Sequence, residues 1–347
     1  MNNEPRRIRA KAREVVTALT GKIGEEAVID VTMLGSVGVG KTTLLASMYE
    51  QFGQVIGTTD LQVTPVDHPT SVKLQEYIED LRRIAHGLRV EGGIPGTGEP
   101  KEYAFGVGRK GHNPLFTLRF TDYPGKYLLG SQRTDGEMLQ RALNRAHVIL
   151  VAIDVPALME RNGYYHTMIN KTQMVTDTIK RMLQRDMARL IILTPLKCEK
   201  YVTTAAGRRE LKARIDEEYR PLINHIGSGD VRGRTACVVT PVQTVGSVVF
   251  HRLEEDPQQR NPVFHFRLKE VDASYAPLDT DQLLRYALSF VVNKYRDNAH
   301  RGVLRTMWER AIGTDTVLTR AVDQFGAGRK SDDGFAVLQT HPYLRQG

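Results

Sequence analysis

The sequence predicts an α/β fold in which helices cover both faces of a mostly parallel sheet. From residue 27 to about residue 246, short apolar runs alternate with segments of helical periodicity. The runs are continuously apolar, which is typical of strands that are buried on both faces. Strands that alternate with helices favour a parallel sheet, because each crossover helix returns the chain to the same edge. The length of 347 residues fits one such domain with additions, or two domains.

Each element follows from its local pattern. Apolar, β-branched runs predict the strands, which are expected at 27–34, 61–64, 101–108, 113–122, 147–155, 188–195 and 235–242. Apolar residues at helical spacing predict the helices, which are expected at 41–52, 70–86, 133–146, 165–187 and 204–226. The stretch 91–100, EGGIPGTGEP, is rich in glycine and proline and is therefore predicted to be a loop.

The two ends of the chain depart from this alternation. A basic helical pattern spans 5–20, and two interpretations of it stay open. We favour packing on its own domain over docking on a membrane surface or partner, since one short helix is a weak anchor. A hairpin, two helices and a glycine-rich, partly disordered polar tail are expected after residue 246. The predicted divisions are 1–26, a domain at 27–246 with an insertion at about 65–113, an extension at 247–325 and a tail at 326–347.

Composition excludes several classes of protein. Hydrophobic residues are 41% and charged residues 25%, as in ordinary soluble domains. The longest apolar run, near 148–155, is far shorter than the roughly 20 residues that span a bilayer. The basic start of the sequence, without an apolar core or cleavage site, predicts no secretory signal, and the only cysteines, Cys198 and Cys237, fit a reducing cytoplasm. The net charge of +8 attracts polyanions, but without an RNA-binding motif or zinc spacing, nucleic acid is a disfavoured partner.

A phosphate-binding motif lies between the first predicted strand and helix. Its residues fit the pattern G-x-x-x-x-G-K-[ST] and are Gly35, Ser36, Val37, Gly38, Val39, Gly40, Lys41 and Thr42. Glycines let successive backbone N–H groups face phosphate oxygens, and the helix that follows directs its positive end at the same phosphates. Lys41 is expected to reach the β- and γ-phosphates, the Thr42 hydroxyl to bind Mg²⁺, and Thr43 to contact the α-phosphate.

A second phosphate element follows one strand later. The apolar run LFTLRF ends in Asp122, at the carboxyl edge of the sheet where ligands of open α/β sheets bind. Asp122 is therefore placed to hold Mg²⁺ through water, and Gly125 can present its N–H to a γ-phosphate. A plain turn is the ordinary interpretation of D-x-x-G, but its position after the phosphate loop favours a functional one.

These residues resemble those of the TRAFAC-class GTPases, over about residues 28–246. The chain is most similar to bacterial predicted small-GTPase-like ATP/GTP-binding proteins. The resemblance implies the three-layer fold of P-loop nucleoside triphosphatases. It also implies a molecular switch in which a γ-phosphate and Mg²⁺ order two loops that relax after hydrolysis.

The resemblance implies further site residues, with departures from the class pattern. In place of the base-recognition motif N-K-x-D stands Leu196-Lys197-Cys198-Glu199. Lys197 matches the lysine that packs on the base, and Glu199 replaces the aspartate that pairs with guanine, which favours GTP over ATP. An ordinary surface glutamate is the alternative for Glu199. For the threonine of the first switch, Thr59 is preferred over Thr58 and Thr64.

The catalytic position departs most from the class. Lys126 stands where Ras-like proteins carry a water-orienting glutamine. A charged lysine cannot accept a hydrogen bond from water, so it either neutralises transition-state charge or is an exposed loop residue. Arg133 is a candidate for an arginine acting in cis. We expect slow turnover, accelerated by a protein activator, a homodimer or such an arginine.

The resulting hypothesis is a cytoplasmic, Mg²⁺-dependent GTPase that acts as a switch with an unidentified protein effector. Two alternatives stay open. One is an ATPase that drives remodelling of a complex, and the other is a module that binds nucleotide without hydrolysing it. A small-molecule kinase is disfavoured, because no arginine-rich lid follows the phosphate site.

Overall fold

The structure is a computed structural model. It describes residues 27–55, 59–86, 98–129, 133–184, 186–255, 262–299 and 316–344. The expected N-terminal helix at 5–20 lies outside these residues. The predicted α/β fold with a mostly parallel sheet is confirmed.

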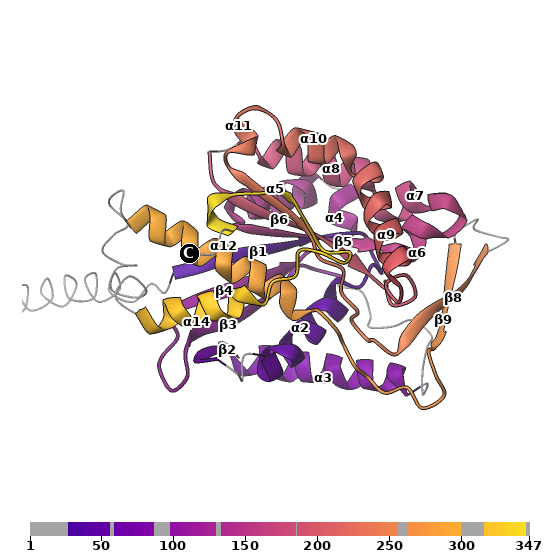
Figure 1. Cartoon of the computed structure of the whole chain (residues 1–347), viewed down its shortest axis with the longest axis horizontal. Coiled ribbons are helices and arrows are strands. Elements are labelled where there is room, and N and C mark those ends of the chain that lie inside the picture. Colours follow the sequence, from indigo (N-terminus) through magenta and orange to yellow (C-terminus); the bar gives the residue numbers. More distant parts are fainter. Residues whose placement is uncertain are drawn as a thin grey trace, which may run out of the picture.

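One eight-stranded sheet forms the centre of the molecule (Figure 1). Its strand order is β10-β7-β6-β5-β1-β4-β3-β2, in which β7, β6, β5, β1 and β4 run parallel. Antiparallel pairing adds β3 and β2 at one edge and β10 at the other. The strands are β1 (Ala27–Leu34), β2 (Leu61–Pro65), β3 (Lys101–Arg109), β4 (Phe116–Asp122), β5 (Val148–Asp154), β6 (Arg189–Leu196), β7 (Thr235–Val239) and β10 (Ala336–Gln339).

Helices cover both faces of this sheet, as its two-sided burial requires. Along β5, Val148 and Leu150 belong to one hydrophobic core, while Ile149 and Val151 belong to the other. The first core lies under α2 (Lys41–Val55), α3 (His68–Ala85), α12 (Asp281–Ala299) and α14 (Thr316–Ala327). The second lies under α5 (Arg133–Arg145), α8 (Thr172–Met182), α9 (Ala205–Glu218) and α10 (Arg220–Ile226). Figure 1 shows α2 and α3 on one side of the sheet and α8 and α10 on the other.

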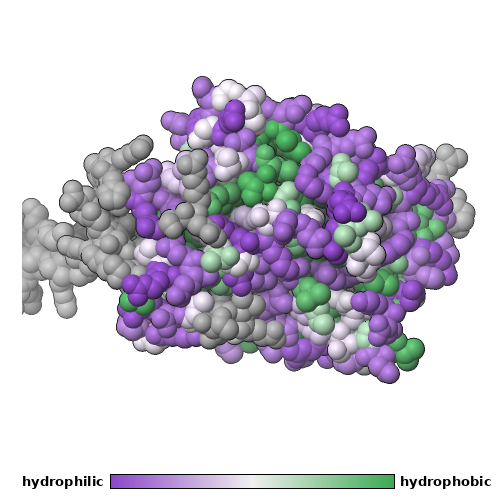
Figure 2. Space-filling view, viewed as in Figure 1, coloured by the Kyte–Doolittle hydropathy of each residue, from purple (hydrophilic) through white to green (hydrophobic). Residues whose placement is uncertain are grey.

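A separate hairpin and several short helices complete the described chain. The hairpin pairs β8 (Val248–Glu255) with β9 (Pro262–Leu268). The short helices are α4 (Lys126–Leu129), α6 (Val155–Met159), η2 (Glu160–Gly163), α7 (His166–Asn170), α11 (Gly229–Arg232) and η4 (Pro342–Leu344). The face seen in Figure 2 is mainly hydrophilic, with its largest apolar area in the upper middle of the view and smaller apolar patches elsewhere. No helix within the described ranges is long and apolar enough to cross a membrane.

Two predicted helices are each divided in two. The helix expected at 165–187 breaks between α7 and α8 at Lys171, whose φ of 51° is left-handed. The helix expected at 204–226 breaks at Tyr219, shortly before Pro221. Proline lacks the N–H that a continuing helix needs, so it begins α10 instead. Hydrophobic spacing persists across both breaks, which is why periodicity alone misses them.

The C-terminal segments belong to the main domain. The tail expected at 326–347 contains β10, in which Ala336 pairs with Val239 on the edge of the sheet. Residues of α12 and α14 lie in the same core as α2, including Leu284 and Phe325. Within the segment expected as an insertion at 65–113, strand β3 pairs with β4 along seven residues. The short, isolated apolar runs of the tail gave too little signal for a strand prediction.

Candidate nucleotide site

The predicted site residues meet at the carboxyl edge of the parallel strands. Met33 in β1 pairs with Asp122 in β4, and Asp154 in β5 pairs with Leu196 in β6. Four loops therefore leave the sheet at one edge, following β1, β4, β5 and β6. The phosphate loop, residues 35–42, is the first of these and passes directly into α2.

The phosphate loop has the backbone conformation that its glycines allow. Gly38 and Gly40 have φ values of 75° and 108°, in the region that favours glycine. The first turn of α2 is closed by Leu44 N, which donates to Gly40 O at 2.8 Å. The free N–H groups at the start of this 15-residue helix thus face the loop.

Lys41 folds back over the loop that precedes it. Its Nζ donates to Gly35 O at 2.9 Å and to Ser36 O at 3.1 Å, which uses two of its three donors. Burial lowers the pKa of Lys41, while the negative charge of Asp122 acts in the opposite direction. An anion in the loop would compensate the buried ammonium.

Thr42 and Asp122 are joined although 80 residues separate them. Thr42 Oγ1 donates to Asp122 Oδ2 at 2.8 Å, and both side chains are buried. Asp122 Oδ1 is buried without a hydrogen-bond partner among the described residues, and burial raises the pKa of this carboxyl. A hydroxyl and a carboxylate with an unsatisfied oxygen fit Mg²⁺, which takes few protein ligands and completes its shell with water and phosphate.

Gly125 lies directly against the phosphate loop. A Cβ placed on Gly125 would lie 2.2 Å from Val37 N and 2.5 Å from Ser36 C. Only glycine therefore lets the loop after β4 approach this closely. The two predicted phosphate elements are in contact.

The lysine of the expected base loop is fixed to the phosphate loop. Lys197 Nζ donates to Gly38 O at 2.9 Å and to Asp154 Oδ2 at 2.6 Å. Lys197 has a left-handed φ of 57°. Its Nζ also lies 5.8 Å from the ring of Phe266 in β9, so the hairpin reaches the base loop.

Glu199 is a buried residue, and this excludes the interpretation as an ordinary surface glutamate. Its Oε1 accepts long hydrogen bonds of 3.4 Å from Val245 N and Gly246 N. Burial raises its pKa, while these backbone donors and Lys197 lower it. The carboxyl thus lies between the loops that follow β6 and β7, where the class contacts the base.

Thr59 does not reach the site. It precedes Leu61, which pairs with Arg109 at the far end of β3, whereas Lys101 at the near end pairs with Asp122. The length of β3 places Thr59 about 26 Å away, at the opposite edge of the sheet. Thr64 lies in mid-strand, opposite Gly106. Closeness in sequence to the phosphate loop suggested Thr59, but the chain forms strand β2 and helix α3 before strand β3 begins beside Asp122.

Lys126, Arg133, Thr58 and Thr43 complete the set of predicted site residues. Lys126 is exposed at the start of α4, with its Nζ 5.9 Å from the ring of Tyr127. Arg133 begins α5, and Thr58 lies outside the described residues. Thr43 is half-buried in the first turn of α2. Among the described residues, no hydrogen bond joins the Lys126 side chain to the phosphate loop.

Sequence analysis missed two contributors to the site. Asp154 ends the buried strand β5 just as Asp122 ends β4, so the same signal could have identified it. Phe266 comes from the hairpin, which lies far along the chain and carries no motif. Its approach to Lys197 depends on tertiary packing alone.

The sequence matches the family described as Double-GTPase 2 over residues 29–241. The chain belongs to this family. The match begins in β1 and ends just after β7, so it covers the phosphate loop, Asp122 and Lys197. The hairpin, α12, α14 and β10 of this Double-GTPase 2 member lie beyond the matched region. A search of curated proteins finds no significant relative.

Solved structures of low sequence identity resemble the chain. The GTP-bound Ski7 GTPase-like domain of S. cerevisiae is 13% identical, with a TM-score of 0.37, covering 63% of this chain and 43% of that one. Sup35 complexed with GDP is 12% identical (TM-score 0.30), covering 63% and 38%. The signal recognition particle receptor SRb-GTP/SRX complex of Chaetomium thermophilum is 14% identical (TM-score 0.34), covering 63% and 91%. The chain thus spans less than half of the Ski7 and Sup35 chains.

Proposed function

We propose that this Double-GTPase 2 protein binds GTP with Mg²⁺, hydrolyses it slowly and acts as a molecular switch with a protein partner. The observation that carries the proposal is the buried pair of Thr42 and Asp122, 2.8 Å apart, beside Lys41 on a glycine-rich loop. These are the residue types and positions that a phosphate chain with a divalent cation requires.

The phosphate chain would be held mainly by positive ends of dipoles and one ammonium. Backbone N–H groups of the loop and of the first turn of α2 point at the anion. Lys41 has a third N–H donor for a phosphate oxygen, after the two that it gives to Gly35 and Ser36. Mg²⁺ held by Thr42 and Asp122 would offset the charge that develops on the phosphate oxygens. Positioning and electrostatics supply the rate enhancement in such sites.

Guanine preference would come from Glu199. Guanine presents two adjacent N–H donors, which one carboxylate can accept together, whereas adenine lacks this pair. The long bonds from Val245 and Gly246 to Oε1 are weak enough to be exchanged for such donors. The stem of Lys197 would pack on the base while its Nζ holds the phosphate loop.

The switch would depend on the contact between Gly125 and the phosphate loop. The loop after β4 lies against Ser36 and Val37, so a γ-phosphate would have to enter between them. The loop would then move to offer its Gly125 N–H to the phosphate and return after hydrolysis. A partner that touches this loop would distinguish the two states.

Removal of the Lys41 ammonium tests the site. We expect Lys41→Ala to abolish binding of fluorescently labelled GTP, because a buried cation for the phosphates is lost. Lys73→Ala, which removes an exposed lysine of α3, is the matched control and should bind as the wild type does. Undiminished binding by Lys41→Ala would refute the phosphate site.

Two further measurements separate the alternatives. Competition by excess ATP against labelled GTP distinguishes an ATPase from a GTPase. If the wild type retains nucleotide but releases phosphate no faster than a Thr42→Ala variant, the protein binds nucleotide without hydrolysing it. The proposed switch requires GTP selectivity and measurable release.

A further inference from the structure

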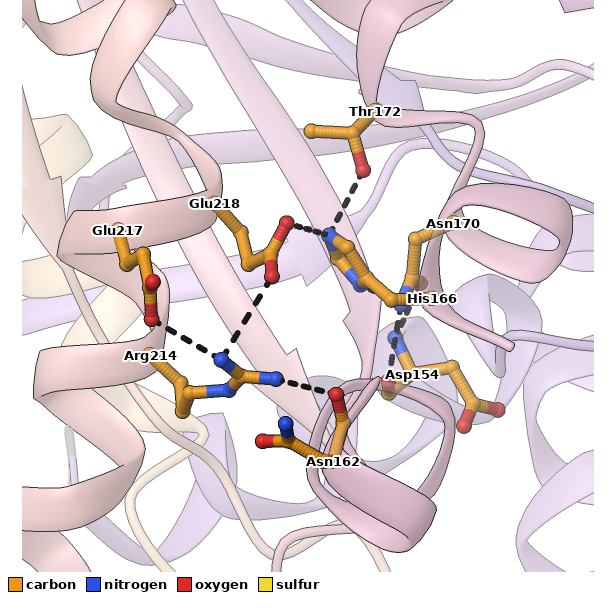
Figure 3. Close-up of polar contacts among 8 residues, drawn as sticks. All are labelled: Asp154, Asn162, His166, Asn170, Thr172, Arg214, Glu217 and Glu218. Atoms are coloured by element: carbon orange, nitrogen blue, oxygen red, sulfur yellow. Dashed lines mark hydrogen bonds and ion pairs between the residues drawn. The ribbon is translucent and has the colours of Figure 1, made fainter. Parts of the chain in front are cut away.

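A buried hydrogen-bond network lies behind the nucleotide site and is centred on His166 (Figure 3). His166 Nδ1 lies 2.9 Å from Asn170 Nδ2, and His166 Nε2 lies 2.7 Å from Thr172 Oγ1. An amide Nδ2 can only donate, so Nδ1 accepts and Nε2 carries the hydrogen that is given to Thr172. Burial and the positive Arg214 lower the pKa of His166 to about 4, against the opposing charge of Asp154, so the ring is neutral at pH 7.

Asn170 connects this histidine to the end of β5. Its Oδ1 accepts from Asp154 N at 2.7 Å, and its Nδ2 donates to Asp154 O at 3.0 Å. One side chain therefore binds both backbone polar groups of Asp154. The Asp154 N–H can only donate and the Asp154 carbonyl can only accept, so these two bonds fix which way the Asn170 amide faces, and its Nδ2 also donates to His166.

Asp154 continues the network to the phosphate loop. Its Oδ1 accepts from Ala157 N at 3.0 Å, which caps α6, and its Oδ2 accepts from Lys197 Nζ at 2.6 Å. Lys197 Nζ in turn donates to Gly38 O at 2.9 Å. Hydrogen bonds thus lead without a gap from His166 to the loop that would hold the phosphates.

The outer end of the network reaches helix α9. Glu218 Oε2 lies 3.9 Å from His166 Nε2, and Arg214 Nη1 lies 2.9 Å from Glu217 Oε2 and 3.8 Å from Glu218 Oε1. Arg214 Nη2 donates to Asn162 O at 2.6 Å, in a turn where Asn162 has a left-handed φ of 54°. Figure 3 shows these side chains converging from α9 and from the segment after β5.

We propose that Asn170, which also donates a hydrogen bond to His166, is a positioning residue that holds the Asp154–Lys197 contact on the phosphate loop and so slows nucleotide release. The inference rests on the proposed function, since it assigns Lys197 to the base. A long lysine side chain loses conformational entropy when it is fixed in one position. Asp154 holds Lys197 before nucleotide binds, and this preorganisation reduces the loss that binding would otherwise incur.

The test is the dissociation rate of labelled GDP from the full chain. Asn170→Ala removes the bonds to Asp154 and should release GDP roughly tenfold faster, as expected for the loss of buried hydrogen bonds. His166→Phe keeps a ring but loses the acceptor for Asn170, so its release should be intermediate. Asn293→Ala is the matched control, because Asn293 Nδ2 donates to Tyr343 O at 3.0 Å in α12, outside this network. It should release GDP at the wild-type rate.

A double variant shows whether Asn170 acts through Lys197. Lys197→Met alone should also accelerate release, and adding Asn170→Ala should cause no further acceleration, since the two act on one contact. Multiplied effects, or wild-type release by Asn170→Ala with only a lower melting temperature, would overturn the inference. If the wild type binds no labelled GDP, the proposed function itself fails before the variants are compared.

Discussion

Lys197 shows how one side chain can join two loops that sequence motifs treat separately. Its amine bonds both Gly38 in the phosphate loop and Asp154 after β5. Hydrogen bonds therefore link the phosphate loop to the loop that we propose recognises the base. A ligand that contacts both loops gains from their shared preorganisation.

Residue types at motif positions were predictable, because phosphate chemistry restricts them. Gly35, Lys41, Thr42 and Asp122 lie where the sequence placed them relative to the strands. The position of Thr59 was not predictable, since it depends on how many strands the chain forms before it returns to the site. Glu199 was identified by a motif, but only the structure shows that it is buried.

The proposed role of Glu199 leads to a prediction about nucleotide choice. Glu199→Gln keeps an oxygen that can accept from Val245 and Gly246, so the fold should persist. We expect GTP affinity to fall roughly tenfold or more, because a charged acceptor for guanine is lost, with ATP affinity unchanged. Calorimetric titrations with both nucleotides measure the ratio. A wild-type ratio of GTP to ATP affinity in the variant would contradict the assignment.

At the scale of elements, a buried arginine joins α5 to β6. Arg189 is fully buried at the first position of β6, and its Nη2 donates to Asn144 O at 3.0 Å. Its Nη1 donates to Leu143 O as well, so a cation satisfies the last carbonyls of α5. Positive charge is favourable at a helix C-terminus. This contact fixes the C-terminal end of α5 at the amino edge of the parallel strands, opposite to the edge where Gly125 lies.

Loss of this cap should destabilise the fold. We expect Arg189→Leu to lower the free energy of unfolding by about 3 kcal/mol, because buried carbonyls lose a charged donor. Arg141→Leu is the control, since Arg141 makes an exposed pair with Glu137, and its loss should cost less than about 1 kcal/mol. Urea denaturation measures both. If both variants lose a similarly small free energy of unfolding, the buried Arg189 cap has no net stabilising effect.

Elements were predictable where hydrophobic periodicity was strong and uninterrupted. The central strands and helix α2 follow from such patterns. The breaks at Lys171 and Tyr219 were not predictable from periodicity, because apolar spacing continues across them. The edge strand β10 is four residues long, and its pairing with β7 is a tertiary event.

At the scale of the whole molecule, the hydrophobic core includes residues that lie beyond the end of the family match. The match ends at residue 241, yet α12 and α14 cover the same face of the sheet as α2. Val291 of α12 is fully buried there. Helices α12 and α14 therefore complete the hydrophobic core of the domain that contains the phosphate loop.

A shortened chain tests this dependence. We expect a chain ending at residue 279 to expose the apolar face under α12 and to aggregate or bind a hydrophobic dye, since large exposed apolar patches are unfavourable. Solubility and dye fluorescence measure the outcome, with the full chain as control. If the shortened chain is soluble and melts cooperatively, the domain does not depend on α12, α14 and β10 for folding.

Buried His166 and half-buried His147 make the whole fold sensitive to acid. Burial, with nearby Lys294 and Arg189, lowers the pKa of His147 to about 3, and the pKa of His166 is lowered to about 4. The unfolded chain binds these protons near pH 6.5. Stability contributed by the neutral histidines is therefore full above pH 6.5 and is lost as the pH falls towards 4, by about 1.4 kcal/mol per pH unit for each.

Comparison of melting curves isolates this effect. The melting temperature of the wild type should fall between pH 6.5 and 5, and that of His147→Gln should fall less steeply. Taking the difference between the two proteins removes contributions from carboxyl groups, which they share. If the melting temperatures of the two proteins fall in parallel with pH, the neutral state that we assign to His147 in the folded protein is wrong.

The most direct test of the central claim is an equilibrium titration of the nucleotide-free protein with labelled GTP in Mg²⁺, competed with unlabelled GTP or ATP. The claim is that the phosphate loop, Thr42 and Asp122 hold a guanine nucleotide. It predicts saturable binding at one site, displaced by GTP at lower concentrations than by ATP and lost in Lys41→Ala. Displacement by ATP at lower concentrations than by GTP, or equal binding by Lys41→Ala, would contradict it.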